Sequence, residues 1–353
     1  LTVIALDLFL SLPRTLVSVI FQMTGMIKEY SFSLMSESTS SFFMIVTMLL
    51  LGVRDYRYLI LADCGARCIS LCVSLHNAPG LIGRQFMNPL VSLKEAVSNI
   101  SVGMFLLLSN MVGLIVIASV RFAVEDQWGI VAFSKVSLAF SISSVAITAT
   151  GAASVVLFPL LKRLTKEKLD QSFSALSLLL IVLLAVLFCL YYPGVSILEW
   201  WLPKYEESFY YLTIILPMTL FDSNFSVIGS NFLKVMRKER NLLSINILAV
   251  VFTWICICVG WYCKLPLDLL LEGIVIQSLI KMGLTIRALN KIMPNVKYYS
   301  FYAGVIVSIL FYVSNLLIGG WIGCGVYGVG CLFLLCAVSG KIKSSLSLLK
   351  GTG

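Results

Sequence analysis

The strongest constraint on this chain is a series of apolar runs, each about 20 residues long, that recur through the whole sequence. An α-helix needs a run of this length to cross the hydrocarbon core of a bilayer. Backbone polar groups in lipid must be satisfied within the protein, so only helices and closed barrels span membranes, and barrel strands would alternate in hydrophobicity. The solid apolar runs therefore predict an all-α polytopic membrane protein.

Composition supports this class and excludes others. Hydrophobic residues form 59% of the chain and charged residues 12%, whereas soluble domains carry about 25% charged residues. The formal charge of +9 does not indicate nucleic-acid binding, because the Lys and Arg residues cluster in short connections between apolar runs, as membrane topology requires. No connection is long enough to hold a separate soluble domain.

We expect eleven membrane spans. The fifth run is long enough to need a tilt or a break, and Gly151 is the expected place for a break. The expected spans cover approximately residues 2–24, 35–52, 55–77, 98–120, 127–158, 172–195, 207–232, 241–263, 266–289, 299–319 and 321–340.

The distribution of basic residues predicts the orientation. The connections after the odd-numbered spans hold far more Lys and Arg than the alternate connections, so they are expected on the cytoplasmic side, together with the C-terminus. The basic residues of the alternate connections are Arg54, Arg57, Arg121, Lys204 and Lys264. Five tryptophans near the expected outer ends fit an interfacial aromatic belt: Trp128, Trp200, Trp201, Trp261 and Trp321.

The start of the chain and an internal similarity both suggest preceding helices. Leu1 lies inside an apolar run and is placed outside, so a protein that begins in the cytoplasm would have an odd number of spans before it. Residues 12–16 read LPRTL and residues 216–220 read LPMTL, in the first and seventh expected spans. Parallel repeats of six helices are a known transporter construction.

Three stretches of the sequence resemble one transporter family. They are residues 99–142, which begin "NISVGMFLLLSNMVGLIVIASVRF" and are followed by "VVLFPLLKRL"; residues 211–247, which begin "YLTIILPMTLFDSNFSVIGSNFL"; and "FQMTGMIKEYS" at residues 21–31. They are similar to the Wzx-type polysaccharide-unit (oligosaccharidyl-lipid) flippases, in the superfamily that also contains multidrug extruders. The chain departs from that family in lacking about three leading helices of an expected fourteen.

The resemblance implies two helical lobes around a central cavity. It would divide the chain into a partial N-terminal lobe (1–77), an inter-lobe cytoplasmic connection (78–97), a C-terminal lobe (98–289) and two additional helices with a cytoplasmic tail (290–353). It also implies a non-enzymatic protein of the bacterial inner membrane that flips an undecaprenyl-pyrophosphate-linked oligosaccharide for capsule or O-antigen lipopolysaccharide assembly. Its partners would be that lipid-linked oligosaccharide, membrane lipids and other polysaccharide-assembly proteins.

Basic residues at membrane depth are the candidates for substrate binding, because such charges usually face a cavity or a partner. Arg14 either offers its guanidinium to the pyrophosphate in the cavity or forms a structural ion pair with Asp7. Arg67 can pair with Asp63 at i,i+4 and still reach the cavity. Lys135 either snorkels outward or faces the cavity, and Arg121 either matches a family arginine or anchors the helix at the interface.

Two carboxylates are candidates for ion coupling, Asp222 and Asp63. Asp222 follows Pro217 in the seventh expected span and has no basic residue within a helical turn, so it either binds a coupling proton or sodium ion or pairs with another helix. The ten cysteines are interpreted as packing residues, and no metal site or cofactor is expected. The glycine-rich stretch 319–330 predicts a tight turn and close helix packing.

Two other functions stay open at this point. A drug or cation extruder of the same superfamily would show a compact cavity dominated by carboxylates. A membrane-bound polysaccharide polymerase or ligase would need a sizeable outer loop, and the longest expected outer connection, residues 196–206, is short.

Overall fold

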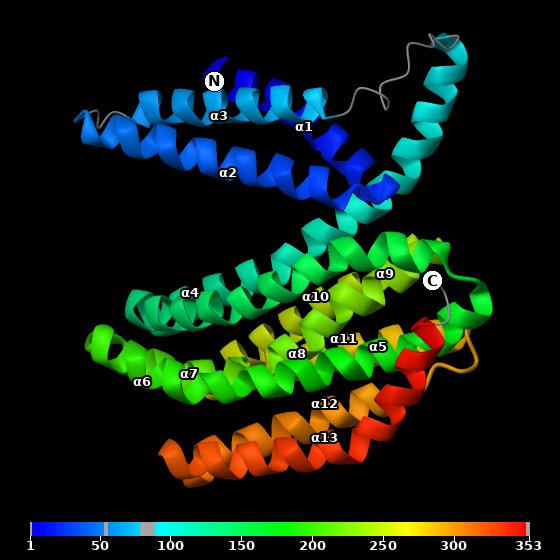
Figure 1. Ribbon diagram of the computed structural model, residues 1–353. Helices are drawn as coiled ribbons and strands as arrows, with labels where there is room; N and C mark the ends of the chain where they lie inside the picture. Colours follow the sequence, from blue (N-terminus) through cyan, green and yellow to red (C-terminus); the bar gives the residue numbers. More distant parts are fainter. Residues whose placement is uncertain (1, 53–55, 78–88, 351–353) are drawn as a thin grey trace. The chain divides into compact units, whose positions relative to one another are not determined.

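The computed structural model describes residues 2–52, 56–77 and 89–350, and every regular element in these ranges is a helix (Figure 1). The chain forms two compact units, Leu1–Leu93 and Lys94–Gly353, called here the N-terminal and the C-terminal unit. The division falls inside the stretch 78–97, for which the sequence predicted a connection. Residues 89–97 of that stretch are helical, so the expected connection is too long by that segment.

The N-terminal unit contains three long helices, α1 (Thr2–Thr24), α2 (Ile27–Leu50) and α3 (Tyr56–His76). The chain turns between α1 and α2 at Gly25, whose φ of 79° is in the left-handed region that favours glycine. All three helices contact one another, and α3 packs against both α1 and α2. Buried serines in place of large side chains allow close helix approach at these contacts.

The C-terminal unit is built around α5, which packs against α12 and α13 on one side and the segment around Asn224 on another. Its core is aromatic as well as aliphatic: Phe173 stacks edge-on against Phe232, and Phe311 contacts Phe188 and Tyr327. The helices are α4 (Pro89–Arg163, which begins in the N-terminal unit), α5 (Lys166–Leu187), α6 (Tyr191–Trp201), α7 (Glu206–Ile215), α8 (Met218–Ser223), α9 (Ser230–Val235), α10 (Glu239–Cys263), α11 (Leu267–Asn290), α12 (Tyr299–Tyr312) and α13 (Gly320–Lys350). Shorter 3₁₀ and π-helical segments join some of them: η1 (Phe188–Leu190), η2 (Pro203–Tyr205), η3 (Asn224–Gly229) and η4 (Val313–Ile318).

Helix α4 corrects two expectations. The sequence predicted a connection between the fourth and fifth spans at about residues 121–126, but these residues are helical, and the two helices joined in α4 meet at Gly129 instead. The break in α4 lies at Gly129, with φ 81° and ψ 175°, and Gly151, where the break was expected, is helical. Extended backbone with a positive φ is accessible almost only to glycine, which explains why the break needs this residue type.

Pro217 lies at a second break. The break separates two segments, Pro203–Ile215 and Met218–Val235. Together they are long and apolar enough for one membrane span, and they are bent by 51° relative to each other. Proline lacks the backbone N–H and its ring crowds the preceding turn, so it bends a helix at this position. Pro13, the matching proline of the LPRTL sequence, lies inside α1 without such a break.

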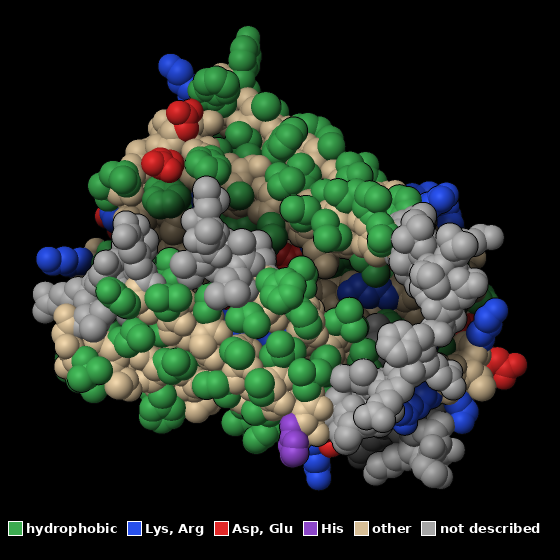
Figure 2. Space-filling view, turned by 90° about the horizontal axis from the view of Figure 1, so that it is seen from above, with side chains coloured by type: hydrophobic (Ala, Val, Ile, Leu, Met, Phe, Trp, Pro, Cys, Tyr) green, Lys and Arg blue, Asp and Glu red, His purple; other side chains and the backbone are tan. Residues whose placement is uncertain are grey.

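Six helices of the described chain are long and apolar enough to cross a membrane, or seven if the bent pair forms one span. This supports a multi-pass membrane protein, with fewer qualifying helices than the eleven expected. Phe9–Gln22 and Gly320–Cys336 are apolar but shorter, and α3, which carries Asp63 and Arg67, does not qualify. Hydrophobic side chains are spread over much of the face seen in Figure 2, as expected for a surface solvated by lipid.

The structure confirms the tight turn and the close helix packing predicted for the glycine-rich stretch 319–330. Gly319 and Gly320 both have positive φ, 69° and 54°, and form the turn between η4 and α13. A Cβ atom on Gly323 would come closer than 3.0 Å to the carbonyl oxygen of Ser314. Glycine therefore lets the start of α13 pack directly on the backbone of η4.

Candidate functional site: two buried charge clusters

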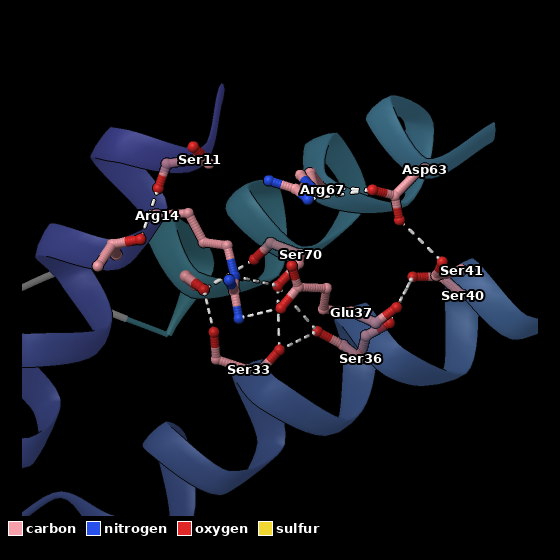
Figure 3. A network of polar contacts seen from close by, with 12 residues as sticks. Ser11, Arg14, Ser33, Ser36, Glu37, Ser40, Ser41, Asp63, Arg67 and Ser70 are labelled. Carbon is pink, nitrogen blue, oxygen red and sulfur yellow. Dashed lines mark hydrogen bonds and ion pairs between the residues drawn. The ribbon is translucent and has the colours of Figure 1, made fainter. Parts of the chain in front are cut away.

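Arg14 lies at the contact of the three N-terminal helices, with a side chain only 10% exposed. Its guanidinium forms an ion pair with Glu37 of α2, and its Nε donates a hydrogen bond to Ser70 Oγ of α3 at 3.1 Å (Figure 3). The structure therefore supports the ion-pair interpretation of Arg14. The prediction of Asp7 as its partner was wrong, because Asp7 pairs with Arg67.

Arg67 joins two carboxylates. Its Nη2 lies 3.1 Å from Asp63 Oδ2, which confirms the i,i+4 pair, and its Nε lies 3.0 Å from Asp7 Oδ1 of α1. Ser41 Oγ donates to the other oxygen of Asp63 at 2.9 Å (Figure 3). The five charged side chains Asp7, Arg14, Glu37, Asp63 and Arg67 are called here the three-helix charge network.

Serine hydroxyls occupy the space between α2 and α3 beside Arg14. Ser70 Oγ donates to the backbone oxygen of Ser33 at 3.0 Å, and the hydroxyls of Ser33 and Ser74 lie 2.6 Å apart. These serines are buried, and hydrogen bonds of this kind hold helices together in lipid. The sequence analysis missed Glu37 and these serines; the run of serines over residues 31–41 was the available signal.

The network contains three carboxylates and two guanidinium groups. With all five groups ionised, its formal charge is therefore negative rather than positive. Both arginines are engaged by carboxylates, so the network is not a preformed cationic pocket.

The second cluster lies in the C-terminal unit. Lys281 Nζ of α11 lies 3.2 Å from Asp222 Oδ1 of α8, with side chains 13% and 20% exposed. The same ammonium group lies 4.1 Å from the centroid of the Phe225 ring, within cation–π range. Asp222 thus has a partner on another helix, which was the open alternative to ion coupling; the sequence analysis missed Lys281, although it is a lone lysine in the ninth expected span.

Buried amides and hydroxyls form hydrogen bonds at residues that directly follow Asp222 in the chain. Asn224 donates from its amide to the backbone oxygen of Ser177 at 2.9 Å and accepts from the Ser177 hydroxyl at 2.8 Å. Thr150 Oγ1 donates to Ser223 Oγ at 3.1 Å, which joins α4 to the same segment. Segment η3 is π-helical, and single π-helical turns occur frequently at functional sites.

The two remaining basic candidates have separate surroundings. Lys135 forms an ion pair with Glu207 of α7, and its side chain is 19% exposed. The guanidinium carbon of Arg121 lies 5.9 Å from the centroid of the Phe140 ring, which is on the other side of the Gly129 break in α4. The structure brings Arg67 and Asp63 together in the N-terminal unit, near Arg14, whereas Arg121, Lys135 and Asp222 in the C-terminal unit each contact a different partner.

The remaining sequence predictions concern metals, cysteines and loops. Within residues 2–52, 56–77 and 89–350, no three His, Cys, Asp or Glu side chains gather where they could hold a metal ion. In the described part of the chain, the eight cysteines other than Cys64 and Cys336 are free thiols. Arg54, which entered the prediction of orientation, lies outside the described residues.

Comparisons with known proteins give no match: no family model, no curated protein and no solved structure matches this chain.

Proposed function

We propose that this protein is a secondary transporter that moves a lipid-linked oligosaccharide from the inner to the outer leaflet of a bacterial cytoplasmic membrane. The observation that carries the proposal is the three-helix charge network, in which Arg14 pairs with Glu37 and Arg67 pairs with Asp7 within an apolar helical bundle. Ionisable groups at membrane depth are expensive and mark substrate or ion pathways. The resemblance to Wzx-type flippases supplies the substrate class.

The physical requirement for such a transporter is clear. A glycan headgroup carries many polar groups, and each one left unsatisfied in hydrocarbon costs several kcal/mol, roughly 2–7. A polar path through the protein removes this barrier while the prenyl tail stays in lipid. In the proposed protein, two lobes alternate in access to that path, and the C-terminus is cytoplasmic.

Within this proposal Arg14 changes partner during transport. A diphosphate accepts two parallel hydrogen bonds from a guanidinium and carries more charge than one carboxylate. Because Arg14 is held by Glu37 and Ser70 in the described structure, the substrate's diphosphate would replace Glu37. Asp222 and Lys281 would then be the site at which a proton is gained or lost, with Asp63 as the corresponding carboxylate in the N-terminal unit.

The test is complementation in a bacterial strain that lacks its own flippase, with surface glycan as the readout. Arg14→Gln is expected to abolish surface glycan, and Arg14→Lys to retain only a small part, because an ammonium group lacks the planar fork. Lys162→Gln, which alters an exposed basic residue at the end of α4, is the matched control and should keep full glycan. Full glycan with Arg14→Gln at normal protein level would remove Arg14 from the proposed mechanism.

A second function, extrusion of drugs or cations, is favoured by one observation. Carboxylates outnumber guanidinium groups in the three-helix charge network, as a cation carrier requires. Efflux of a cationic dye from cells that express the protein would support this function, and loss of efflux in Asp7→Asn would assign it to the network. A polymerase or ligase is not proposed, because the described connection between α6 and α7 spans only residues 202–205.

A further inference from the structure

A second polar region of the C-terminal unit lies between α6, α7, η4 and the start of α13, and its lining includes neither Asp222 nor Lys281. Here the structure encloses a pocket of about 220 Å³ lined by Tyr191, Tyr192, Tyr210, Glu199, Asn315 and Trp321, among others. A neighbouring pocket of about 360 Å³ shares Tyr191, Tyr210 and Glu199 with it and adds Glu206 and Glu207. The shared walls make the two one continuous depression.

The hydroxyl groups of its three tyrosines are bonded to the protein. Tyr191 Oη lies 2.5 Å from Thr213 Oγ1, Tyr192 Oη lies 3.0 Å from Ser314 Oγ, and Tyr210 Oη donates to Asp268 at 3.2 Å. A ligand in the pocket therefore meets the rings of these residues more than their donors.

The side chains of Asn315 and Ser196 in the pocket are also engaged. Asn315 donates its amide hydrogens to Tyr192 Oη at 3.2 Å and to the backbone oxygen of Phe311 at 2.8 Å. Ser196 Oγ donates to the backbone oxygen of Tyr192 at 3.1 Å. What the pocket offers to a ligand is consequently carboxylate acceptors, aromatic rings and the indole N–H of Trp321.

The charge of the pocket has one sign. Three carboxylates line the joined pockets and no Lys or Arg does. Glu207 is neutralised by Lys135, whereas no ion pair of Glu199 or Glu206 occurs among the described residues. Two exposed carboxylates, Glu199 and Glu206, thus line the joined pockets with no ion-pair partner among the described residues.

From this geometry we infer that the pocket between α6, α7 and η4 binds an ammonium group, either of a soluble amine or of a lipid headgroup. Carboxylates combined with aromatic faces are the surroundings that bind quaternary and primary ammonium ions. Exposed tryptophans beside the pocket, Trp200, Trp201 and Trp321, are typical of the membrane interface, where lipid headgroups lie. The inference does not depend on which substrate the protein transports.

The test is isothermal titration of the purified full chain in detergent with choline, with 3,3-dimethyl-1-butanol as its neutral isostere. Saturable binding of choline and no binding of the alcohol are expected. Glu199→Gln should weaken choline binding about tenfold or more, because it removes a carboxylate without changing shape. Glu167→Gln, at an exposed position of α5 outside the pocket, is the matched control and should bind choline as the unchanged protein does.

A second arm identifies the source of the ammonium group. Short-chain phosphatidylethanolamine added to the detergent should displace choline if the natural ligand is a lipid headgroup, whereas a soluble amine as ligand predicts displacement by ethanolamine alone. Tyr210→Leu, at a half-exposed ring, should weaken choline binding in either case. Equal binding of the neutral alcohol, unchanged affinity in Glu199→Gln, or no saturable choline binding by a folded protein would each overturn the inference.

Discussion

The ion pair between Arg14 and Glu37 predicts a strong energetic coupling between these residues. We consider Arg14→Gln, Glu37→Gln and the double variant, which keep hydrogen-bonding capacity while removing charge. Breaking one side of a fully buried pair costs about 3–5 kcal/mol. The Arg14 and Glu37 side chains are 10% and 23% exposed, and Arg14 keeps its hydrogen bond to Ser70 in Glu37→Gln. We therefore expect a smaller loss, about 2 kcal/mol, for each single variant.

In the double variant neither charge is left alone, so its loss should be no larger than that of a single variant. The resulting coupling energy is about 2 kcal/mol, within the range for residues in direct contact. The assay is reversible unfolding in mixed micelles by increasing SDS fraction, followed by circular dichroism. The pair of Lys135 with Glu207 is the control: Glu207 is 69% exposed, so the same cycle there should give about 1 kcal/mol or less. Additive losses for Arg14 and Glu37 would refute the buried ion pair.

Two further predictions use the same unfolding assay. Gly323→Ala should lower the free energy of unfolding by about 1–3 kcal/mol, because its Cβ would meet the Ser314 carbonyl. Gly328→Ala on the same helix meets no atom within 4 Å and should leave stability unchanged or raise it by up to about 1 kcal/mol, so equal effects of the two variants would contradict the close packing of α13. Lys281→Met should destabilise the protein by about 2–3 kcal/mol, because it leaves the Asp222 carboxylate uncompensated. Addition of Asp222→Asn should recover most of that loss, and wild-type stability of Lys281→Met alone would show that the ion pair contributes nothing.

The sequence predicted the fold class because the length and solidity of apolar runs are local properties. It also predicted the pair of Asp63 with Arg67, since i,i+4 spacing places both on one face of any helix. The pairs of Arg14 with Glu37 and of Asp222 with Lys281 could not be predicted in this way. They join different helices, and which side chains meet depends on helix rotation and packing, which spacing alone does not determine.

The position of the break in α4 shows the same limit. Gly129 follows Trp128 and Gly151 follows Thr150, and either glycine could take a positive φ. The expected break at Gly151 rested on the length of the fifth run, but the helix extends through the polar residues at 121–126 and changes direction at Gly129 instead. Polar residues next to a span therefore did not mark a connection, since a helix can continue through them with its backbone groups satisfied.

The carboxylate partners of Arg14 and Arg67 change what the proposed transport mechanism must explain. A free guanidinium would attract any anion, whereas one held by a carboxylate binds only a ligand that competes with that carboxylate. A singly charged headgroup offers Arg14 little more than Glu37 already does, but a diphosphate offers a second negative charge and a matching fork geometry. A ligand that displaces Glu37 also leaves that carboxylate to take up a proton or a cation, because an unpaired charge in a low-dielectric interior is unfavourable. Binding of an anionic substrate and uptake of a cation would thus be coupled through this one ion pair.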